Sequence, residues 1–192
     1  MTGAVVLADA EGLDAITMRA VAGHLGFKVM SLYNHVAGKD DLLEAMVDAV
    51  LADVDPPAAP SWRDDIVATA TALNGTLREH RWATHLWPLV FPGPHRWRLA
   101  ERLLADLAAA DLPPERQDLG FHLVVNHIVG FSHLQGGYAA IPEAEGRARF
   151  EREQLTTVYP HLEAHARFHA TDRREARPDE FRLVLDLILD SL

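Results

Sequence analysis

The stretch from Thr17 to Lys39 constrains the fold of this chain more than any other, because it reads as two short helices joined by a glycine turn. Thr17 is a favourable N-cap, since its hydroxyl can accept from the free amides of a first helical turn. The apolar residues that follow it have helical spacing: Val21, Ala22 and Leu25. These features predict a helix over about Met18 to His24.

Gly26 follows that helix and can take the positive φ that ends a helix tightly. Phe27 is then placed to enter the core between two helices. The second helix is predicted over about Lys28 to His35, and a helix this short forms only by packing on its neighbours. Its inward side chains are expected to be Val29, Leu32 and Val36, and its outward ones Lys28, Met30, Ser31, Tyr33, Asn34 and His35. Together the two helices make a helix-turn-helix.

Charge is distributed unevenly along this acidic chain, which has 28 Asp and Glu against 18 Lys and Arg. Even residues 1–53 contain more acids than bases, whereas many DNA-binding domains are strongly basic. No acid, however, lies between Ala15 and Lys39. Because a surface for phosphate must exclude carboxylates locally, this acid-free stretch is the part of the chain suited to nucleic acid.

The residues from Ile16 to Leu43, ITMRAVAGHLGFKVMSLYNHVAGKDDLL, resemble the DNA-binding signature LTxRxxAxxLGxxxxxLYxHVxxKxxLL of the TetR (tetracycline-repressor) family of bacterial regulators. A weaker resemblance continues in PSWRDDIVATATALNGTLREHRWATHLW, which is similar to the opening of the tetracycline-repressor type of regulatory domain. The resemblance implies an all-α fold, with a three-helix head and a larger helical ligand-binding and dimerisation domain. Family members usually begin earlier, with a basic arm and a longer first helix, which this sequence lacks.

The resemblance also implies that the second helix of the motif enters the major groove. There, lysines would supply charge to phosphates, and the hydroxyl and imidazole groups would donate to backbone oxygens. Ser31 and Asn34 can reach base edges, and an outward Met30 would touch thymine methyls. The predicted DNA-binding residues are Thr17, Arg19, Lys28, Val29, Met30, Ser31, Tyr33, Asn34, His35 and Lys39. The alternative is a helix-turn-helix that serves only as packing.

Other patterns divide the chain into two parts. Residues 3–11 read as a short helix stopped by Gly12, and a helix with one apolar face opens at Asp40. The breaker run DPPAAP over residues 55–60 marks a domain boundary, so we predict domains at 1–54 and 55–192. Beyond the boundary, helices are expected over residues 62–78, 82–90, 95–110, 115–139, 150–168 and 179–191.

The last predicted helix is apolar on most of its circumference, and its polar residues form one narrow stripe: Arg182, Asp186 and Asp190. A terminal helix has few neighbours within its own chain that could bury such a surface, so a homodimer is expected. The long helix over 115–139 offers a matching face with Asn126, Gly130, His133 and Gly137. Two such helices from each subunit would make a four-helix interface, as the resemblance also implies. The alternative places both helices in a monomer core.

Aromatic residues of the second domain could line a pocket for an apolar or aromatic effector, although aromatic residues at helical spacing are also common in plain cores. His122, Asn126 and His133 share a polar stripe on the long helix, where burial would require an effector, water or the partner subunit to satisfy them. The predicted effector-binding residues are Trp82, Trp87, Phe91, Trp97, Phe121, His122 and Asn126.

His161, His165 and His169 have a spacing that could hold Zn(II) or Ni(II), with Glu163 between them, but a solvated histidine-rich face is the preferred reading. No metal site, cofactor or enzyme activity is predicted, because the HxExH order is not HExxH and no nucleophile elbow, phosphate loop or dinucleotide fingerprint occurs. The absence of cysteine and of long apolar runs predicts a cytoplasmic protein without a membrane span.

These features favour a DNA-binding transcriptional regulator, a repressor that a small molecule releases from a palindromic operator. The alternative is a helical dimeric interaction protein with weakened DNA binding.

Overall fold

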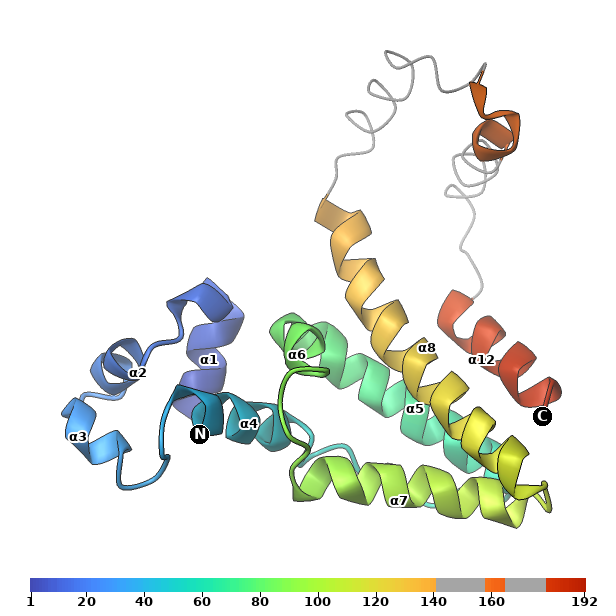
Figure 1. The fold of residues 1–192 in the computed structure, drawn as a ribbon, viewed down its shortest axis with the longest axis horizontal. Coiled ribbons are helices and arrows are strands. Elements are labelled where there is room, and N and C mark those ends of the chain that lie inside the picture. Colours follow the sequence, from blue (N-terminus) through green and yellow to red (C-terminus); the bar gives the residue numbers. More distant parts are fainter. Residues whose placement is uncertain (141–157, 165–178) are drawn as a thin grey trace.

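The structure, a computed structural model, describes residues 1–140, 158–164 and 179–192, and these parts contain helices and no strand (Figure 1). This confirms the expected all-helical fold. Its helices are α1 (Thr2–Glu11), a 3-10 turn (Leu13–Ala15), α2 (Met18–His24), α3 (Val29–Leu32), α4 (Lys39–Val50), α5 (Trp62–Glu79), α6 (Arg81–Leu86), α7 (Pro94–Ala109), α8 (Pro114–Ala140) and α12 (Glu180–Asp190). None of the described helices is long and apolar enough to cross a membrane.

Helices α1 to α4 form a small head, and its local signals act as the sequence predicts. The Thr17 hydroxyl accepts from the amide of Ala20 at 3.1 Å, so α2 begins where its cap requires. Gly26 has φ 72°, and the amide of Phe27 donates to the carbonyl of Ala22 at 2.9 Å. This closure, in which the chain turns through a left-handed glycine, ends α2 and sets the direction of α3.

Two expectations for the head are wrong. Phe27 does not enter the core, because its side chain is 62% exposed. The second helix is also shorter than predicted, since α3 ends at Leu32 and turns follow as far as His35. A single helical turn offers too little surface to cover an aromatic ring. Phe27 therefore lies at the rim of an apolar hollow of about 450 Å³, which Leu25 and Val36 also line.

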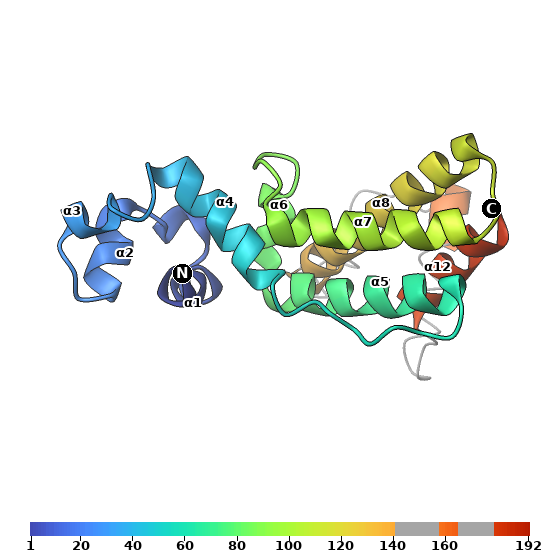
Figure 2. The ribbon, with the colours of Figure 1, turned by 90° about the horizontal axis from the view of Figure 1, so that it is seen from below.

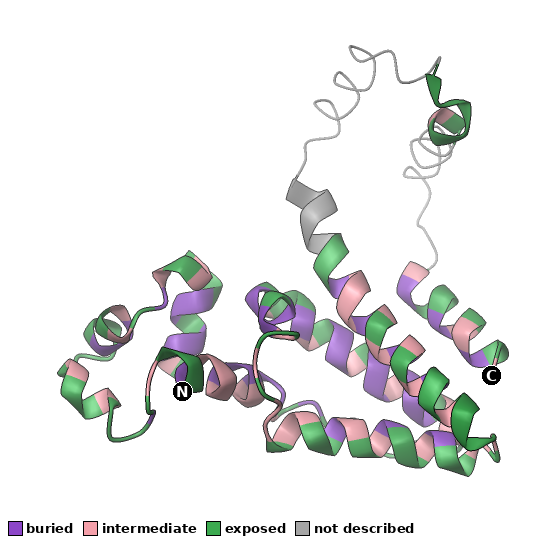
Figure 3. Cartoon of the chain, viewed as in Figure 1, coloured by how far each residue is buried: buried purple, intermediate pink, exposed green. Residues whose placement is uncertain are grey.

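The remaining helices form a larger body around α5, which packs against α6, α7, α8 and α12. Figure 2 shows α5 and α7 running side by side, and Figure 3 shows that α5 carries much of the buried surface. The hydroxyl of Ser61 accepts from the amide of Asp64 at 3.1 Å, which confirms the predicted start of α5. Helix α4 leads from the head into this body, so the two parts meet along α4 and the beginning of α7.

The C-terminal helix α12 leaves part of its apolar surface uncovered. Phe181, Leu185 and Leu189 are buried against the body, whereas Leu183 and Leu187 are 49% and 68% exposed. The two acids of its polar stripe are paired with Arg63 of α5, whose guanidinium lies 2.8 Å from Asp190 and 3.4 Å from Asp186. Neighbours within the chain thus bury about half of α12, in line with the expectation of a partner subunit.

The outer face of α8 is exposed and carries polar residues as well as Leu119 and Leu134. His122, Asn126 and His133 are all exposed, so the expectation that this stripe is buried is wrong for the single chain. His122 lies 3.6 Å from Asp118 one turn earlier, and the ring of His133 contacts the hydroxyl of Thr84 at 3.2 Å. The cause is the arrangement of the body, which covers α8 on the opposite side, where Val124 and Ile128 are fully buried.

Candidate nucleic-acid interface

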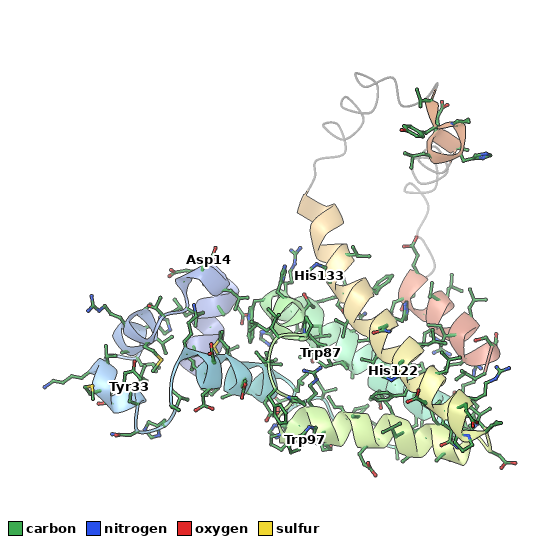
Figure 4. All side chains as sticks on the ribbon, in the orientation of Figure 1. Asp14, Tyr33, Trp87, Trp97, His122 and His133 are labelled. Carbon is green, nitrogen blue, oxygen red and sulfur yellow. The ribbon has the colours of Figure 1, made fainter. Side chains whose placement is uncertain are left out.

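Helix α3 and the turn after it present a continuous exposed face at the far end of the head. Met30 is 73% and Tyr33 46% exposed, and Figure 4 shows Tyr33 at the side of the head away from the body. The other exposed residues of this segment are Lys28, Ser31, Asn34 and His35, whereas Val29 is half-buried. The outward assignment from the sequence is therefore confirmed for these side chains. Val36 is buried as expected and anchors the segment to the core.

Three cations accompany this face. Arg19, Lys28 and Lys39 are exposed, and none of them forms an ion pair with a residue that the structure describes. By contrast, Arg63 and Arg102 of the body are both paired with carboxylates. A lysine or arginine that is free of protein partners can release counterions from DNA without first losing an internal ion pair. These three positive charges of the head are therefore available to a nucleic acid.

Three acids of the head are held by specific contacts. Asp9 accepts from the indole of Trp82 at 2.7 Å and lies 2.9 Å from the ring of His80. Asp48 lies 2.7 Å from the ring of His95. The carboxylate of Asp41 accepts from the amide of Ala37 at 2.8 Å, at the start of α4. Two of these acids therefore point to the body, which explains how an acidic head can still offer a basic face.

The residues predicted to bind an effector are not gathered at one place. Trp82 is buried, and its indole donates a hydrogen bond to Asp9 at the junction between head and body. Phe91 and Trp97 are 67% and 54% exposed and stack edge to face, 6.0 Å between ring centroids, on the surface of the body. His122 and Asn126 lie on the exposed face of α8, as the position of His122 in Figure 4 shows.

Only two members of that set lie within the body. Trp87 is half-buried at the end of α6, and the guanidinium of Arg96 covers its ring at 4.1 Å while donating to its carbonyl at 2.9 Å. Burial lowers the pKa of Arg96. Phe121 is half-buried on α8 and packs against the core. These two aromatic side chains are the members of the set that are half-buried against the core of the body.

Sequence reasoning missed the polar groups inside the body. Asp65 of α5 accepts two hydrogen bonds from Arg102 of α7, at 2.8 and 2.9 Å, and these hold the pKa of Asp65 at about 2. Burial, and then the charge of Asp65, raise the pKa of the neighbouring Asp106 to about 6. No pattern in the sequence could reveal this pairing, because the partners come from different helices.

The predicted histidine row cannot be compared with the structure, since His165 and His169 lie outside the described residues. His161 lies within them, and among the described residues no group of three or more His, Cys, Asp or Glu could hold a metal ion.

Comparison with known proteins agrees with this architecture. Residues 1–46 match the profile described as "Bacterial regulatory proteins, tetR family", and residues 56–192 match "Tetracyclin repressor-like, C-terminal domain". An HTH-type transcriptional regulator of Saccharopolyspora erythraea is 37% identical over 135 residues, which are 68% of this chain and 56% of that protein. The tetracycline repressor protein class E of Escherichia coli is 31% identical over 116 residues, 58% of this chain and 55% of that protein.

The matched regions thus span about half the length of these two relatives. Among solved structures, that of ActR from Streptomyces coelicolor in complex with actinorhodin has a TM-score of 0.78 at 25% identity, covering 99% of this chain and 92% of that one. BioQ with its double-stranded DNA operator, at 22% identity and a TM-score of 0.67, shares the fold. With profiles that match both the head and the body, the chain belongs to the TetR family of bacterial regulatory proteins.

Proposed function

We propose that this protein is a DNA-binding transcriptional regulator, a repressor that a small molecule releases from a palindromic operator. The observation that carries the proposal is the exposed face of α3, together with Arg19, Lys28 and Lys39, which are exposed and form no ion pair with a described residue. The sequence from Ala15 to Lys39, which includes α3, contains no acid, and this reduces the repulsion of phosphate. Relatives support the reading, because the Saccharopolyspora erythraea protein is a transcriptional regulator and the Escherichia coli protein a tetracycline repressor.

The DNA contacts that we propose are those expected from the sequence. Lysine and arginine side chains and the hydroxyls of Thr17 and Tyr33 would contact the phosphate backbone, which positions α3 in the major groove. Ser31 and Asn34 would read base edges, and Met30, which is 73% exposed, would contact thymine methyl groups. Val29 is only half-buried and would support these contacts.

A homodimer is the second part of the proposal. The exposed leucines of α12 and the exposed face of α8 give each subunit a surface that a second copy could cover. Two-fold pairing of these helices would place two heads on the two half-sites of a palindrome, about one helical turn or a multiple of it apart. The chain would divide at residues 1–54 and 55–192, with DNA bound by the first part and the effector by the second.

We propose that the effector is an apolar or aromatic small molecule that contacts Trp87 and Phe121. ActR, with a TM-score of 0.78 and 25% identity, has been solved with actinorhodin. Release would follow if the effector bound better to the conformation whose head spacing does not fit the operator. Such a regulator acts in the cytoplasm, where the operator lies, and needs neither catalysis nor a cofactor.

Selection of duplexes from a random-sequence library, followed by sequencing, tests the proposal. The expected result is enrichment of one palindromic motif whose half-site centres are about 34 to 36 Å apart, or a multiple of that distance. Recovery of no motif by the folded, dimeric protein would contradict the proposal and favour a helical interaction protein.

A further inference from the structure

Helix α7 carries three side chains on one face that all reach out of the body toward the head. His95, Arg98 and Arg102 are spaced at i, i+3 and i+7, which places them in one row along the helix. We infer that this row on α7 sets the orientation of the DNA-binding head by holding α4 and the linker after it at three points. The inference rests on the proposed function, in which head orientation determines operator fit.

The first point lies at the beginning of α7. No side chain of the local sequence caps this helix, whose N-cap is Gly93. The carboxylate of Asp48, from α4, takes that place: it accepts from the amide of His95 at 2.9 Å and lies 2.7 Å from the His95 ring. A β-carbon at Gly93 would collide with Asp48, so glycine is required for this close approach. The head thus supplies the cap of a body helix.

The second point lies at the end of α4. The guanidinium of Arg98 donates to the carbonyls of Ala52 and Val54, each at 3.2 Å, and a weaker contact reaches Leu51 at 3.4 Å. Ala52 and Val54 follow the end of α4 at Val50, where the chain no longer forms helical hydrogen bonds and its carbonyls need other donors. Arg98 supplies these donors, and it therefore fixes the turn by which the chain leaves the head.

The third point lies on the linker. Arg102 donates to the carbonyl of Pro56 at 2.7 Å while it holds Asp65, and Asp65 in turn accepts from the amide of Ala59 at 2.7 Å. A proline-rich linker has few backbone amides with which to form its own structure. The contacts to Arg102 and Asp65 therefore tie residues 55–60 to α5 and α7.

Three contacts along one helix fix the direction of the segment that they hold, whereas a single contact would let that segment rotate about it. His95 and Arg102 are seven positions apart on α7, which is roughly 10 Å at 1.5 Å per residue. Helix α6 and its N-cap also contact the head, since His80 and Trp82 both contact Asp9 of α1 and α6 packs against α4. The row on α7 adds polar contacts at three further points, on α4 and on the linker, and these contacts fix the angle of α4. His95, Arg98 and Arg102 act as positioning residues that need no contact with DNA.

The absence of cysteine makes a direct distance measurement feasible. We would introduce Asp14→Cys in the head and Thr71→Cys on α5, both at exposed positions, and attach spin labels. Labelled chains diluted with an excess of unlabelled protein report the intrachain distance between head and body by double electron–electron resonance. The width of the distance distribution then measures how firmly the head is oriented.

We would compare the distance distributions of the Asp48→Ala and Arg98→Gln variants with that of the labelled protein without these substitutions. The control is Arg63→Gln, which removes ion pairs between α5 and α12 far from the head. We expect the distance distribution to be at least twofold wider in Asp48→Ala and in Arg98→Gln, with the helix content by circular dichroism unchanged. The distribution of the control should not change. Should Arg98→Gln fail to fold, Arg98→Lys keeps the charge but offers fewer donors, and we expect an intermediate width.

A distribution of unchanged width in folded Asp48→Ala and Arg98→Gln would overturn the inference. Operator binding by the unaltered protein is measured separately. Widening in a protein that binds no operator would leave the positioning role intact and refute the proposed function, so the two failures are distinguishable.

Discussion

The substitution Asp106→Asn is predicted to stabilise the protein near neutral pH. Asp106 follows Arg102 by one turn on α7, and its Oδ2 atom is buried without a hydrogen-bond partner among the described residues. Burial and the Asp65 charge raise its pKa from 3.8 to about 6, so ionisation is less favourable in the folded protein than in the unfolded chain. The stabilising contribution of a raised pKa is fully present below pH 3.8 and is lost as the pH rises through about 6.

The pKa shift sets the magnitude. A shift of roughly 2 units corresponds to ~3 kcal/mol at 1.36 kcal/mol per unit. Because the side chain is partly exposed, solvent screening reduces this to ~1 to 2 kcal/mol. An amide at position 106 mimics the protonated acid and avoids that cost. At pH 7.5 the variant should therefore melt ~2 to 8 °C higher than the unaltered protein, given about 2 to 4 °C per kcal/mol for a chain of this size.

Thermal unfolding followed by circular dichroism at fixed protein concentration, from pH 4 to pH 8, measures this effect. The gain in Tm should disappear as the pH falls from 6 toward 4, since both proteins are then neutral at this position. Glu101→Gln, an exposed change on the same helix, is the matched control and should show no such pH dependence. A variant that is no more stable at pH 7.5, or that is stabilised equally at every pH, would refute the reasoning.

Three further predictions concern the head and the dimer. Tyr33→Phe and Lys39→Ala should each weaken operator binding without lowering Tm, and equal affinity in fluorescence anisotropy would contradict the assigned contacts. Phe27→Ala should cost less than ~1 kcal/mol, because the ring is 62% exposed, whereas Phe181→Ala should cost ~3 to 5 kcal/mol in chemical denaturation; similar costs would mean that Phe27 is buried. Leu187→Glu should dissociate the dimer in analytical ultracentrifugation, and an unchanged sedimentation coefficient would argue against α12 at the interface.

Local signals in the sequence predicted much of the fold. The helix caps Thr17 and Ser61, the left-handed Gly26 and the proline-rich linker each act within a few residues of the chain, so their effects can be read directly from sequence. The bounds of α2 follow from such signals, and so do the exposed side chains of α3. The apolar excess of α12 was predictable for a different reason, since its leucines outnumber the positions that one helix face can bury.

The junction between head and body could not be predicted in this way. Asp48 and His95 are separated by 47 residues, and each is an ordinary polar residue within its own helix. The exposure of Phe27 depends on how far α3 extends, which tertiary packing decides. Most of the residues expected to bind an effector do not lie together in the structure, for a similar reason. Aromatic residues at helical spacing do not show which face of a helix the body covers.

The measurement that tests the central claim most directly is the salt dependence of operator binding. Fluorescence anisotropy with a labelled operator duplex, repeated across a salt series, gives the slope of log K against log salt. If the head binds phosphate through Arg19, Lys28 and Lys39, the slope should be steeply negative, and Lys39→Ala should make it shallower by about 1. A slope near zero, or one that Lys39→Ala leaves unchanged, would contradict the account of this face as the DNA-binding surface.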